Sequence, residues 1–185
     1  YISNLFMEKS IKTYLKHTYK DFKYRSVNPP LVRTSTMVFK SMTDLRQVQK
    51  KNQKNPRGGY FEYGRQGTIT THELEKILTK LEESYHTFLT PTGFGSVFLA
   101  LFSVLRPGDE IIISDPIYSP TRQLTENYLK EFNIDTKFYD PKNLNTIKEN
   151  FTKKTKLIYV ENPGSNTFEF QDLKKIISFA KKNKI

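Results

Sequence analysis

Apolar and polar positions along the chain change from an irregular to a periodic pattern near residue 60. Beyond that point, short apolar runs of strand length alternate with segments whose apolar residues recur every three or four positions. The runs predict strands at residues 86–90, 110–114, 134–139 and 156–161. The periodic segments predict one helix that ends near residue 81. They predict further helices at residues 94–105, 119–131, 144–150 and 170–182.

Three of these helices carry a clear apolar face, which identifies the side that packs inward. Thr70 and Glu73 form a capping box at the start of the first one. Its apolar positions are Leu74, Ile77, Leu78 and Leu81. In the second helix, which ends at Arg106-Pro107-Gly108, they are Phe94, Val97, Phe98, Leu101, Phe102 and Leu105. In the last helix they are Leu173, Ile176, Ile177 and Ala180.

The alternation of short strands with amphipathic helices predicts an α/β fold, with a mostly parallel sheet covered by helices on both faces. The sequence reaches residue 185 after a helix, where the next strand would begin. A sheet truncated there leaves an edge and apolar helix faces uncovered. We therefore expect the chain alone to be poorly soluble or oligomeric.

Residues 1–57 predict an extended N-terminal arm that holds one or two helices. Asn28-Pro29-Pro30 favours extended backbone, and Ser41 is placed to cap a short helix through Asn52. The segment Asn55-Pro56-Arg57-Gly58-Gly59 closes that helix. We expect the arm to contact a partner subunit, because it has little to bury on its own.

The remaining residues, 58–185, are expected to form the first part of the α/β domain. The chain opens on Tyr1-Ile2-Ser3-Asn4, which is neither an initiator methionine nor a signal peptide. We therefore expect the natural N-terminus to lie upstream.

Composition narrows the functions open to the chain. Its 185 residues, of which 36% are hydrophobic and 14% aromatic, suffice for a packed core. No apolar run approaches the roughly 20 residues that span a bilayer. The absence of cysteine excludes disulfides, thiolate metal sites and cysteine nucleophiles, and the three histidines show no metal-ligand spacing. We expect a cytoplasmic protein with no metal and no membrane contact.

The net charge of +11 allows two interpretations. A basic balance is typical of proteins that bind nucleic acid. Here the lysines are spread over predicted helix faces and ends, and none is interleaved with aromatics as in a nucleic-acid module. A solvated surface is therefore favoured over nucleic-acid binding.

Three short segments carry candidate binding chemistry. Thr92-Gly93-Phe94-Gly95 leads into the long apolar helix, where free backbone N–H groups and glycine suit a phosphate, although a plain turn fits the same residues. Tyr63-Gly64-Arg65 offers a planar guanidinium fork and a hydroxyl for phosphate oxygens, or an ordinary surface loop. Tyr118 follows the strand at 110–114, at the carboxyl edge where open α/β sheets bind ligands.

These segments, together with a fourth, carry a family resemblance. In order they are Tyr63-Gly64-Arg65-Gln66-Gly67-Thr68, Pro91-Thr92-Gly93-Phe94-Gly95, Asp115-Pro116-Ile117-Tyr118-Ser119-Pro120 and Glu161-Asn162-Pro163-Gly164-Ser165. From about Val27 to the last residue, the chain resembles the N-terminal half of the Cys/Met-metabolism family of pyridoxal-phosphate (PLP) enzymes. The resemblance implies the aminotransferase-like fold, fold type I, with pyridoxal 5'-phosphate as cofactor. It ends before the family's Schiff-base lysine, pyridine-binding aspartate and substrate-carboxylate arginine.

The resemblance also implies roles for individual residues. The backbone of Gly93 and Phe94 receives the cofactor phosphate, and Tyr118 lies flat against the pyridine ring. Tyr63 and Arg65 reach the phosphate of a neighbouring subunit's cofactor, and Tyr63 assists catalysis together with Tyr118. A site shared in this way implies a homo-oligomer, such as a dimer of dimers, or a separate C-terminal half.

Two departures from the γ-acting relatives point to the cystathionine β-lyase branch. Those relatives carry Ser/Thr-Pro-Thr-Asn-Pro where this chain has Asn162-Pro163-Gly164-Ser165-Asn166, so Ser165 stands in place of the asparagine. They also read Tyr-Ser-Arg-x-x-Asn-Pro-Thr where this chain has Tyr63-Gly64-Arg65-Gln66-Gly67-Thr68-Ile69-Thr70. The implied reaction is β-elimination of L-cystathionine to homocysteine, pyruvate and ammonia in methionine biosynthesis. A cysteine desulfhydrase, a methionine γ-lyase, and a non-catalytic remnant or partner subunit stay open.

Overall fold

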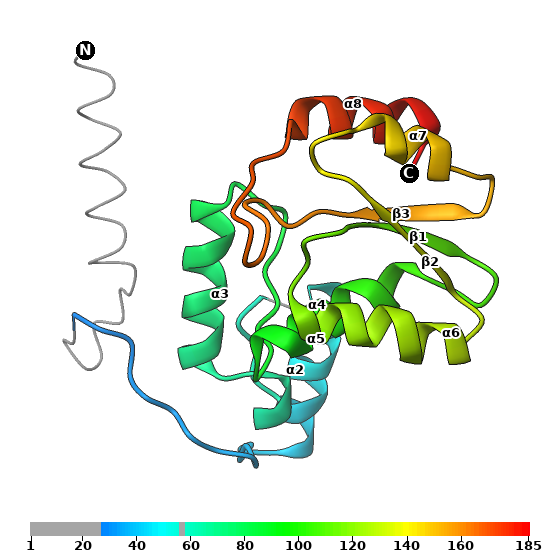
Figure 1. The fold of residues 1–185 in the computed structure, drawn as a ribbon. Helices are drawn as coiled ribbons and strands as arrows, with labels where there is room; N and C mark the ends of the chain where they lie inside the picture. Colours follow the sequence, from blue (N-terminus) through cyan, green and yellow to red (C-terminus); the bar gives the residue numbers. More distant parts are fainter. Residues whose placement is uncertain (1–26, 56–57) are drawn as a thin grey trace. The chain divides into compact units, whose positions relative to one another are not determined.

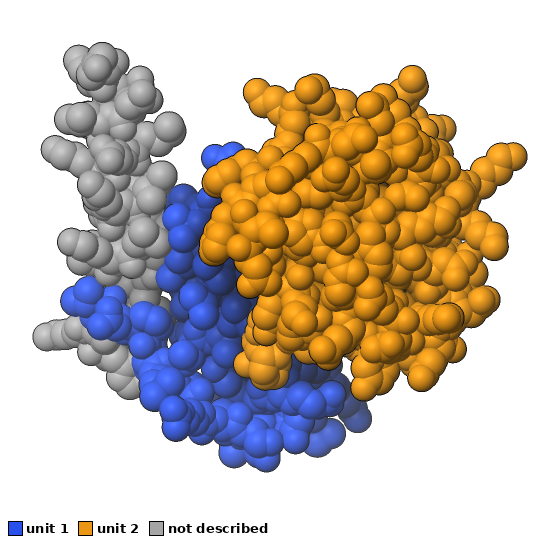
Figure 2. Space-filling view, in the orientation of Figure 1, with its two compact units in different colours: residues 1–89 blue, residues 90–185 orange. Residues whose placement is uncertain are grey.

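The computed structural model describes residues 27–55 and 58–185 (Figure 1). The chain divides into two compact units, Tyr1–Leu89 and Thr90–Ile185, which Figure 2 shows in different colours. Residues 1–26 of the predicted arm, and Pro56 and Arg57 of the predicted helix-closing segment, lie outside the described residues. The expectation that residues 1–57 contact a partner subunit stays a prediction.

A parallel sheet organises the second unit, as the sequence predicted. Its strands lie in the order β2-β1-β3 and both pairings are parallel. Their bounds are Glu110–Ser114 for β1, Asp135–Tyr139 for β2 and Thr155–Tyr159 for β3. The predictions for β1 and β2 are confirmed to within a residue. β3 ends two residues earlier than predicted, because the chain leaves the sheet for a loop that begins before Pro163, a residue without a backbone N–H.

Helices cover both faces of this sheet (Figure 1). In chain order they are α4 (Gly93–Val104), α5 (Ser119–Gln123), η2 (Leu124–Tyr128), α6 (Leu129–Glu131), α7 (Asn145–Asn150) and α8 (Leu173–Asn183). The predicted helix at 119–131 is confirmed as three consecutive segments, α5, η2 and α6, and η2 is a π-helical turn. α8 begins at Leu173, three residues later than predicted, because the Asp172 side chain accepts the Lys175 N–H and caps the helix there.

Alternating side chains of β1 build two separate cores. Ile111 and Ile113 face one cluster, which also contains buried leucines of α4, η2 and α6. Ile112 points to the opposite face and packs with Ile147 of α7 and Ile176 of α8. The prediction of helices on both faces is therefore confirmed.

The predicted inward face of α8 is partly wrong. Ile176 is buried, whereas Leu173 and Ile177 are 40% and 50% exposed. α8 contacts the sheet through Ile176 and Phe179, which lie three positions apart on one side of the helix. That orientation turns Leu173 and Ile177 outward.

A buried carboxylate joins all three strands at the amino end of the sheet. Glu110 pairs with Lys137 at 2.8 Å and accepts hydrogen bonds from the hydroxyls of Thr155 (2.7 Å) and Thr152 (3.1 Å). Burial raises the pKa of the Glu110 carboxyl, but these hydrogen bonds outweigh burial and hold it below its ordinary value.

The first unit contains the helices α2 (Met42–Lys54) and α3 (Ile69–Leu81) and the 3₁₀ turn η1 (Gly64–Gln66). Ser41 caps α2 by accepting the Asp44 N–H, as predicted. The predicted capping box of Thr70 with Glu73 is wrong, because α3 begins earlier and Thr68 is its N-cap. The Thr70 hydroxyl instead donates to the Pro30 carbonyl at 2.7 Å and accepts the Val32 N–H at 2.8 Å.

Two further predictions for this unit are corrected. The buried residues of α3 are the polar His72, Glu73 and Glu75, whereas Leu74 and Leu81 of the predicted inward face are 45% and 42% exposed. Residues 86–90 form no strand in the structure, since no described segment pairs with them through a backbone ladder.

Candidate functional site

The candidate site in the second unit lies at the carboxyl edge of the sheet, between β1 and β3. After β1 the chain enters α5, whose continuation through η2 and α6 packs on one face. After β3 the chain reaches α8, which packs on the other face. The two loops therefore separate at a topological switch point, the place where open α/β sheets bind ligands.

Tyr118 lies in the loop after β1, at the N-cap position of α5. Its neighbour Ile117 is anchored in the core, whereas the Tyr118 side chain is 50% exposed. Its backbone N–H donates to Oε2 of Glu161 at 2.9 Å. The structure therefore places Tyr118 at the carboxyl edge, as the sequence predicted, with a ring face available to a ligand.

The loop after β3 folds closely against the loop that carries Tyr118. The Ser165 N–H donates to the Pro116 carbonyl at 2.9 Å, and the Ser165 hydroxyl donates to Oε1 of Glu161. A Cβ atom on Gly164 would lie 2.9 Å from Cγ of Pro116. A glycine at position 164 therefore permits the contact between the two loops.

A buried glutamine supports both loops from behind. The Gln171 side-chain amide donates to Oγ of Ser114 at 3.1 Å and to the Glu161 carbonyl at 2.9 Å, and its oxygen accepts the Tyr139 hydroxyl. Burial raises the pKa of Tyr139 to about 12, although hydrogen bonds to Ser114 and Gln171 oppose the shift. The Tyr139 hydroxyl is therefore a neutral donor near pH 7.

An ion pair between Arg122 and Asp115 shapes the start of the Tyr118 loop. Arg122 donates to both the side chain and the carbonyl of Asp115 at 2.6 Å, and to Glu126 at 2.9 Å. Its guanidinium carbon lies 4.0 Å from the centre of the Phe138 ring. An open cavity of about 670 Å³ is lined in part by these residues.

Gly93 and Phe94 form the first turn of α4. Thr92 caps this helix by accepting the Gly95 N–H at 2.9 Å. Within the described part of the chain, the N–H groups of Gly93 and Phe94 have no hydrogen-bond partner. A Cβ atom on Gly93 would meet nothing within 4 Å. Two free donors on an open helix N-terminus fit a phosphate group.

The direction of α4 places this turn near the carboxyl edge. α4 ends at Val104 and β1 begins at Glu110, so the last turn of α4 lies near the amino end of β1. α4 packs on the sheet through Leu101 and Leu105. Its 12 residues span about 18 Å, close to the roughly 17 Å of a five-residue strand. Gly93 and Phe94 are therefore brought to the side of the sheet that carries Tyr118.

Tyr63 and Arg65 belong to the first unit, at the turn η1. The Tyr63 hydroxyl accepts a hydrogen bond from Ser35 at 3.0 Å, and the Arg65 guanidinium lies 5.5 Å from the Tyr63 ring centre. Both side chains are exposed. Gly64 lies against the Thr34 carbonyl, where a Cβ atom would come within 1.8 Å of the oxygen, so only glycine fits.

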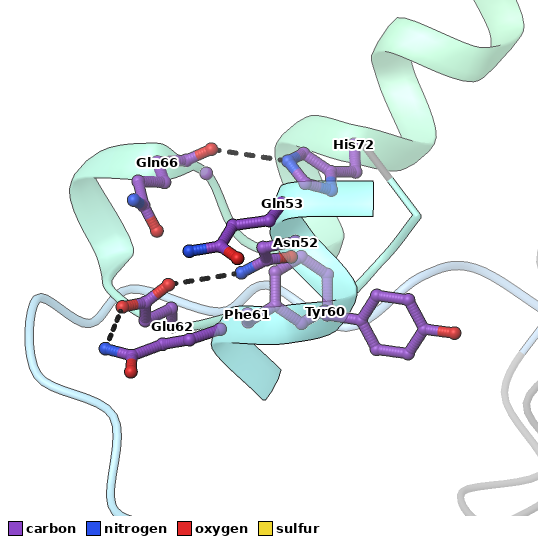
Figure 3. Close-up of a pocket in the computed structure, with 9 residues that line it drawn as sticks. Asn52, Gln53, Tyr60, Phe61, Glu62, Gln66 and His72 are labelled. Atoms are coloured by element: carbon purple, nitrogen blue, oxygen red, sulfur yellow. Dashed lines mark hydrogen bonds between the residues drawn. The ribbon is translucent and has the colours of Figure 1, made fainter. Parts of the chain in front are cut away.

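A polar pocket of about 610 Å³ lies beside this turn (Figure 3). Glu62, which precedes Tyr63, points its carboxylate at two amides of α2: it accepts from Gln49 at 2.8 Å and from Asn52 at 3.3 Å. His72 of α3 packs against Phe61 and contacts the Gln66 carbonyl at 3.4 Å. α2 and α3 thus fix both ends of the segment that carries Tyr63 and Arg65.

Sequence reasoning missed Glu161 and Gln171 as parts of the candidate site. Glu161 is the last residue of a predicted strand whose carboxyl end borders β1, and that position was a usable signal. Gln171 gave no local signal, because its partners come from three different strand ends. His72 is buried.

The profile of the family described as Cys/Met metabolism PLP-dependent enzymes matches residues 12–185. The chain belongs to this family. Among its relatives, the "Putative cystathionine beta-lyase" of Saccharomyces cerevisiae is 38% identical over 86% of this chain and 44% of its own length. An L-methionine gamma-lyase of Fusobacterium nucleatum subsp. polymorphum is 29% identical over 86% of this chain and 39% of its own length.

The fold of this family member is also that of PLP-dependent fold type I enzymes. A Campylobacter jejuni protein named "putative O-acetylhomoserine (thiol)-lyase" superposes with a TM-score of 0.82 and 24% identity, over 95% of this chain and 42% of that one. That structure carries N'-pyridoxyl-lysine-5'-monophosphate. The chain therefore spans less than half the length of the relatives it matches, and its family uses pyridoxal 5'-phosphate.

The residues of this family member fit that cofactor at two places in the second unit. The free N–H groups of Gly93 and Phe94 suit its phosphate, and the half-exposed Tyr118 ring suits its pyridine. Among residues 27–55 and 58–185, no helix is long and apolar enough to cross a membrane, and no group of three or more histidine, aspartate or glutamate side chains could hold a metal ion.

Proposed function

We propose that this chain is the first part of the cofactor-binding domain of a PLP-dependent carbon–sulfur lyase that cleaves L-cystathionine by β-elimination. One observation supports it above others. The free donors of Gly93 and Phe94 and the ring of Tyr118 lie on the same side of the second unit's sheet. A single ligand that carries both a phosphate group and an aromatic ring can contact these donors and the Tyr118 ring only if they lie on the same side of the sheet.

Each of these residues has a binding task in the proposal. The backbone N–H groups of Gly93 and Phe94 hold the phosphate, where the helix N-terminus favours negative charge. The Tyr118 ring lies along the pyridine and fixes its tilt. The bound cofactor supplies an electron sink for the Cα–H bond of the substrate. Orientation of the ring relative to that bond is then the contribution of Tyr118.

Tyr63 and Arg65 act across a subunit boundary in the proposal. The Arg65 guanidinium is exposed and free of acidic partners among the described residues, so it is available to phosphate oxygens. The Tyr63 hydroxyl accepts from Ser35 and still has its own proton to donate near the substrate. This arrangement implies a homo-oligomer, a dimer of dimers, or assembly with a separate C-terminal half. It fits a cytoplasmic enzyme.

The choice of β-elimination rests on Ser165. Its hydroxyl donates to Glu161, whereas the γ-acting relatives carry an asparagine at the matching place. The products would be homocysteine, pyruvate and ammonia, in methionine biosynthesis. A cysteine desulfhydrase and a methionine γ-lyase are the alternatives within the family, and a non-catalytic remnant or partner subunit is the alternative outside catalysis.

Kinetics of the natural protein, captured from its source cells, test the reaction. Its intact mass is measured first, because a mass near twice 21.7 kDa means that the rest of the family's domain is present. We then expect pyruvate release from L-cystathionine with a kcat/KM at least about tenfold above that for L-cysteine or L-methionine, a difference of about 1.4 kcal/mol in transition-state binding. A preference for methionine would replace the proposal with γ-elimination.

Binding of the cofactor to the 185-residue chain tests the site itself. We expect pyridoxal 5'-phosphate to bind more tightly than pyridoxal, because only the former has a phosphate for Gly93 and Phe94. Equilibrium dialysis of the two compounds measures the difference. Equal affinities would exclude the phosphate site at α4.

A further inference from the structure

Glu161 is the one side chain in the described structure that bonds both to the loop carrying Tyr118 and to the loop after β3. Its Oε2 accepts the Tyr118 backbone N–H at 2.9 Å. Its Oε1 accepts the Ser165 hydroxyl. The carboxylate thus bridges the two loops at the switch point of the sheet.

The backbone of Glu161 is fixed independently of its side chain. Its carbonyl accepts the Gln171 side-chain amide at 2.9 Å, and the same amide also donates to Ser114 at the end of β1. Gln171 is only 7% exposed, and its own backbone N–H donates to Asn162 at 2.8 Å. The carboxylate therefore extends from a rigid base toward Tyr118.

Tyr118, in contrast, is held only through its backbone. Its hydroxyl makes no hydrogen bond to any described residue, and half of the side chain is exposed. The position of its ring then depends on the loop backbone and on the first turn of α5. A carboxylate at that N-terminus also interacts favourably with the positive end of the helix that runs through residue 131.

We propose that Glu161 is a positioning residue: its carboxylate fixes the Tyr118 backbone, and with it the plane in which the ring meets the cofactor. The importance of that plane rests on the proposed function, whereas the bridge itself does not. Ser165 has a second role in this arrangement. Its hydroxyl is committed to Glu161, which holds the carboxylate in the rotamer that reaches Tyr118.

The electrostatics of the bridge are consistent with a charged acceptor. A hydrogen bond from an N–H to a carboxylate is shorter and stronger than one to a neutral amide. Burial, and after it the Glu161 charge, raise the pKa of the nearby Tyr159 hydroxyl. Replacing the carboxylate by an amide of the same shape therefore isolates the bridge from packing.

The test compares two isosteric variants of the 185-residue chain. Glu161→Gln keeps the shape of the side chain but leaves one uncharged oxygen as acceptor, so neither the Tyr118 N–H nor the Ser165 hydroxyl retains a charge-assisted bond. Glu169→Gln is the matched control, because Glu169 lies in the same loop, carries the same charge, and makes no side-chain bond to Tyr118. Hydrogen–deuterium exchange, resolved to single amides, reports on the bridge directly.

We expect Glu161→Gln to speed exchange of the Tyr118 amide at least about tenfold, since a charge-assisted bond is lost. Exchange of Ile112 and Ile113 in β1 should stay within about twofold, because global opening is unchanged. Glu169→Gln should leave all three amides unchanged. An unchanged Tyr118 amide in Glu161→Gln, or equal acceleration in β1, overturns the proposal.

A cofactor readout separates this proposal from the proposed function. Pyridoxal 5'-phosphate should bind Glu161→Gln at least about threefold more weakly than Glu169→Gln, because a loosened Tyr118 costs ordering on binding. If the unsubstituted 185-residue chain binds no pyridoxal 5'-phosphate, the proposed phosphate site at α4 fails, kinetics of the natural protein still test the proposed reaction, and the exchange result alone decides the bridge. If the native chain binds and the two variants bind equally, the positioning role fails.

Discussion

The two compact units bury different kinds of side chain. Every buried hydrophobic residue within the described ranges lies in the second unit, on one face or the other of its sheet. The buried residues of the first unit are polar: Thr68, His72, Glu73 and Glu75. Meanwhile, hydrophobic side chains such as Val38, Leu74 and Phe88 are 94%, 45% and 61% exposed there.

That difference separates two ways of placing functional residues. In the second unit, Tyr118 is positioned by strand ends that a hydrophobic core holds in place. In the first unit, Tyr63 and Arg65 depend on the hydrogen bond that Glu62 accepts from Gln49, on the one that Ser35 donates to Tyr63, and on a glycine that lies against a carbonyl. The arrangement in the second unit rests on hydrophobic cores of its own. The arrangement in the first unit gains most from a surface that covers its apolar side chains.

The largest expected effect tests the two kinds of core. Ile113→Ala in β1 should lower the free energy of unfolding by about 3–4 kcal/mol, because it removes buried methyl groups and leaves a cavity. Leu74→Ala in α3 should change it by less than about 0.5 kcal/mol, since 45% of this residue is already exposed and it belongs to no buried cluster of the described residues. Urea unfolding followed by circular dichroism measures both. Similar losses in the two variants would contradict the comparison.

A smaller effect is expected from the glutamines that support each candidate segment. Gln171→Ala should cost about 2–3 kcal/mol of unfolding free energy, because it removes a buried acceptor of the Tyr139 hydroxyl and the donor to the Glu161 carbonyl. Gln49→Ala should cost about 0.5–1 kcal/mol, since Glu62 keeps its bond to Asn52 and water reaches the pocket. The same unfolding experiment applies. A loss of unfolding free energy in Gln49→Ala as large as that in Gln171→Ala would show that the first unit depends on buried polar groups as strongly as the second unit does.

Acid should weaken the second unit through Glu110. Its pKa is lower in the folded chain than the ordinary value of 4.5, so its contribution is present above that value and is lost as the pH falls through the folded pKa. Glu110→Gln should cost about 1.5 kcal/mol near pH 7. It should also flatten the decline in stability below about pH 4.5. Urea midpoints at a series of pH values measure this decline in both proteins. If stability falls equally with acid in the two, Glu110 is excluded as the source of the decline.

The smallest effect compares the two helix caps. Thr92→Ala removes the acceptor of the Gly95 N–H and should cost about 1 kcal/mol. Ser41→Ala removes the matching acceptor for Asp44 in α2 and should cost a similar amount locally. Hydrogen exchange at Gly95 and Asp44 measures each cap. Thermal unfolding should respond to Thr92→Ala alone, and a lower midpoint in Ser41→Ala would mean that the two units unfold together.

The same contrast decides how much of the fold was predictable. β1 was predicted to the residue because its apolar run is too short for a buried helix and is rich in isoleucine, which favours a strand. α3 was placed correctly in part, but its apolar stripe suggested an inward face that the structure exposes. Thr70 was assigned to a cap from its spacing to Glu73, whereas its hydroxyl bonds Pro30 and Val32, forty residues or so away in sequence. Local spacing cannot report such distant partners.

The candidate site divides along similar lines. The positions of Tyr118 and of the α4 N-terminus followed from strand and helix ends, and the structure confirms both placements. Their roles toward the cofactor, like those of Tyr63 and Arg65, come from the family resemblance and stay predictions. Glu161 and Gln171 emerged only from the structure, because their contacts join strand ends that are adjacent in the sheet and distant in the chain.

The strand order β2-β1-β3 has a consequence for synthesis of the protein. The central strand is made first, and both of its neighbours follow it along the chain. At ribosomal rates of about 5–20 residues per second, β1 waits a few seconds for β3 with at least one edge unpaired. Its sequence, Glu110-Ile111-Ile112-Ile113-Ser114, is apolar and rich in β-branched residues, which is typical of segments that aggregate when exposed. The nascent chain is therefore expected to need chaperone protection during the interval between the emergence of β1 and that of Thr155–Tyr159.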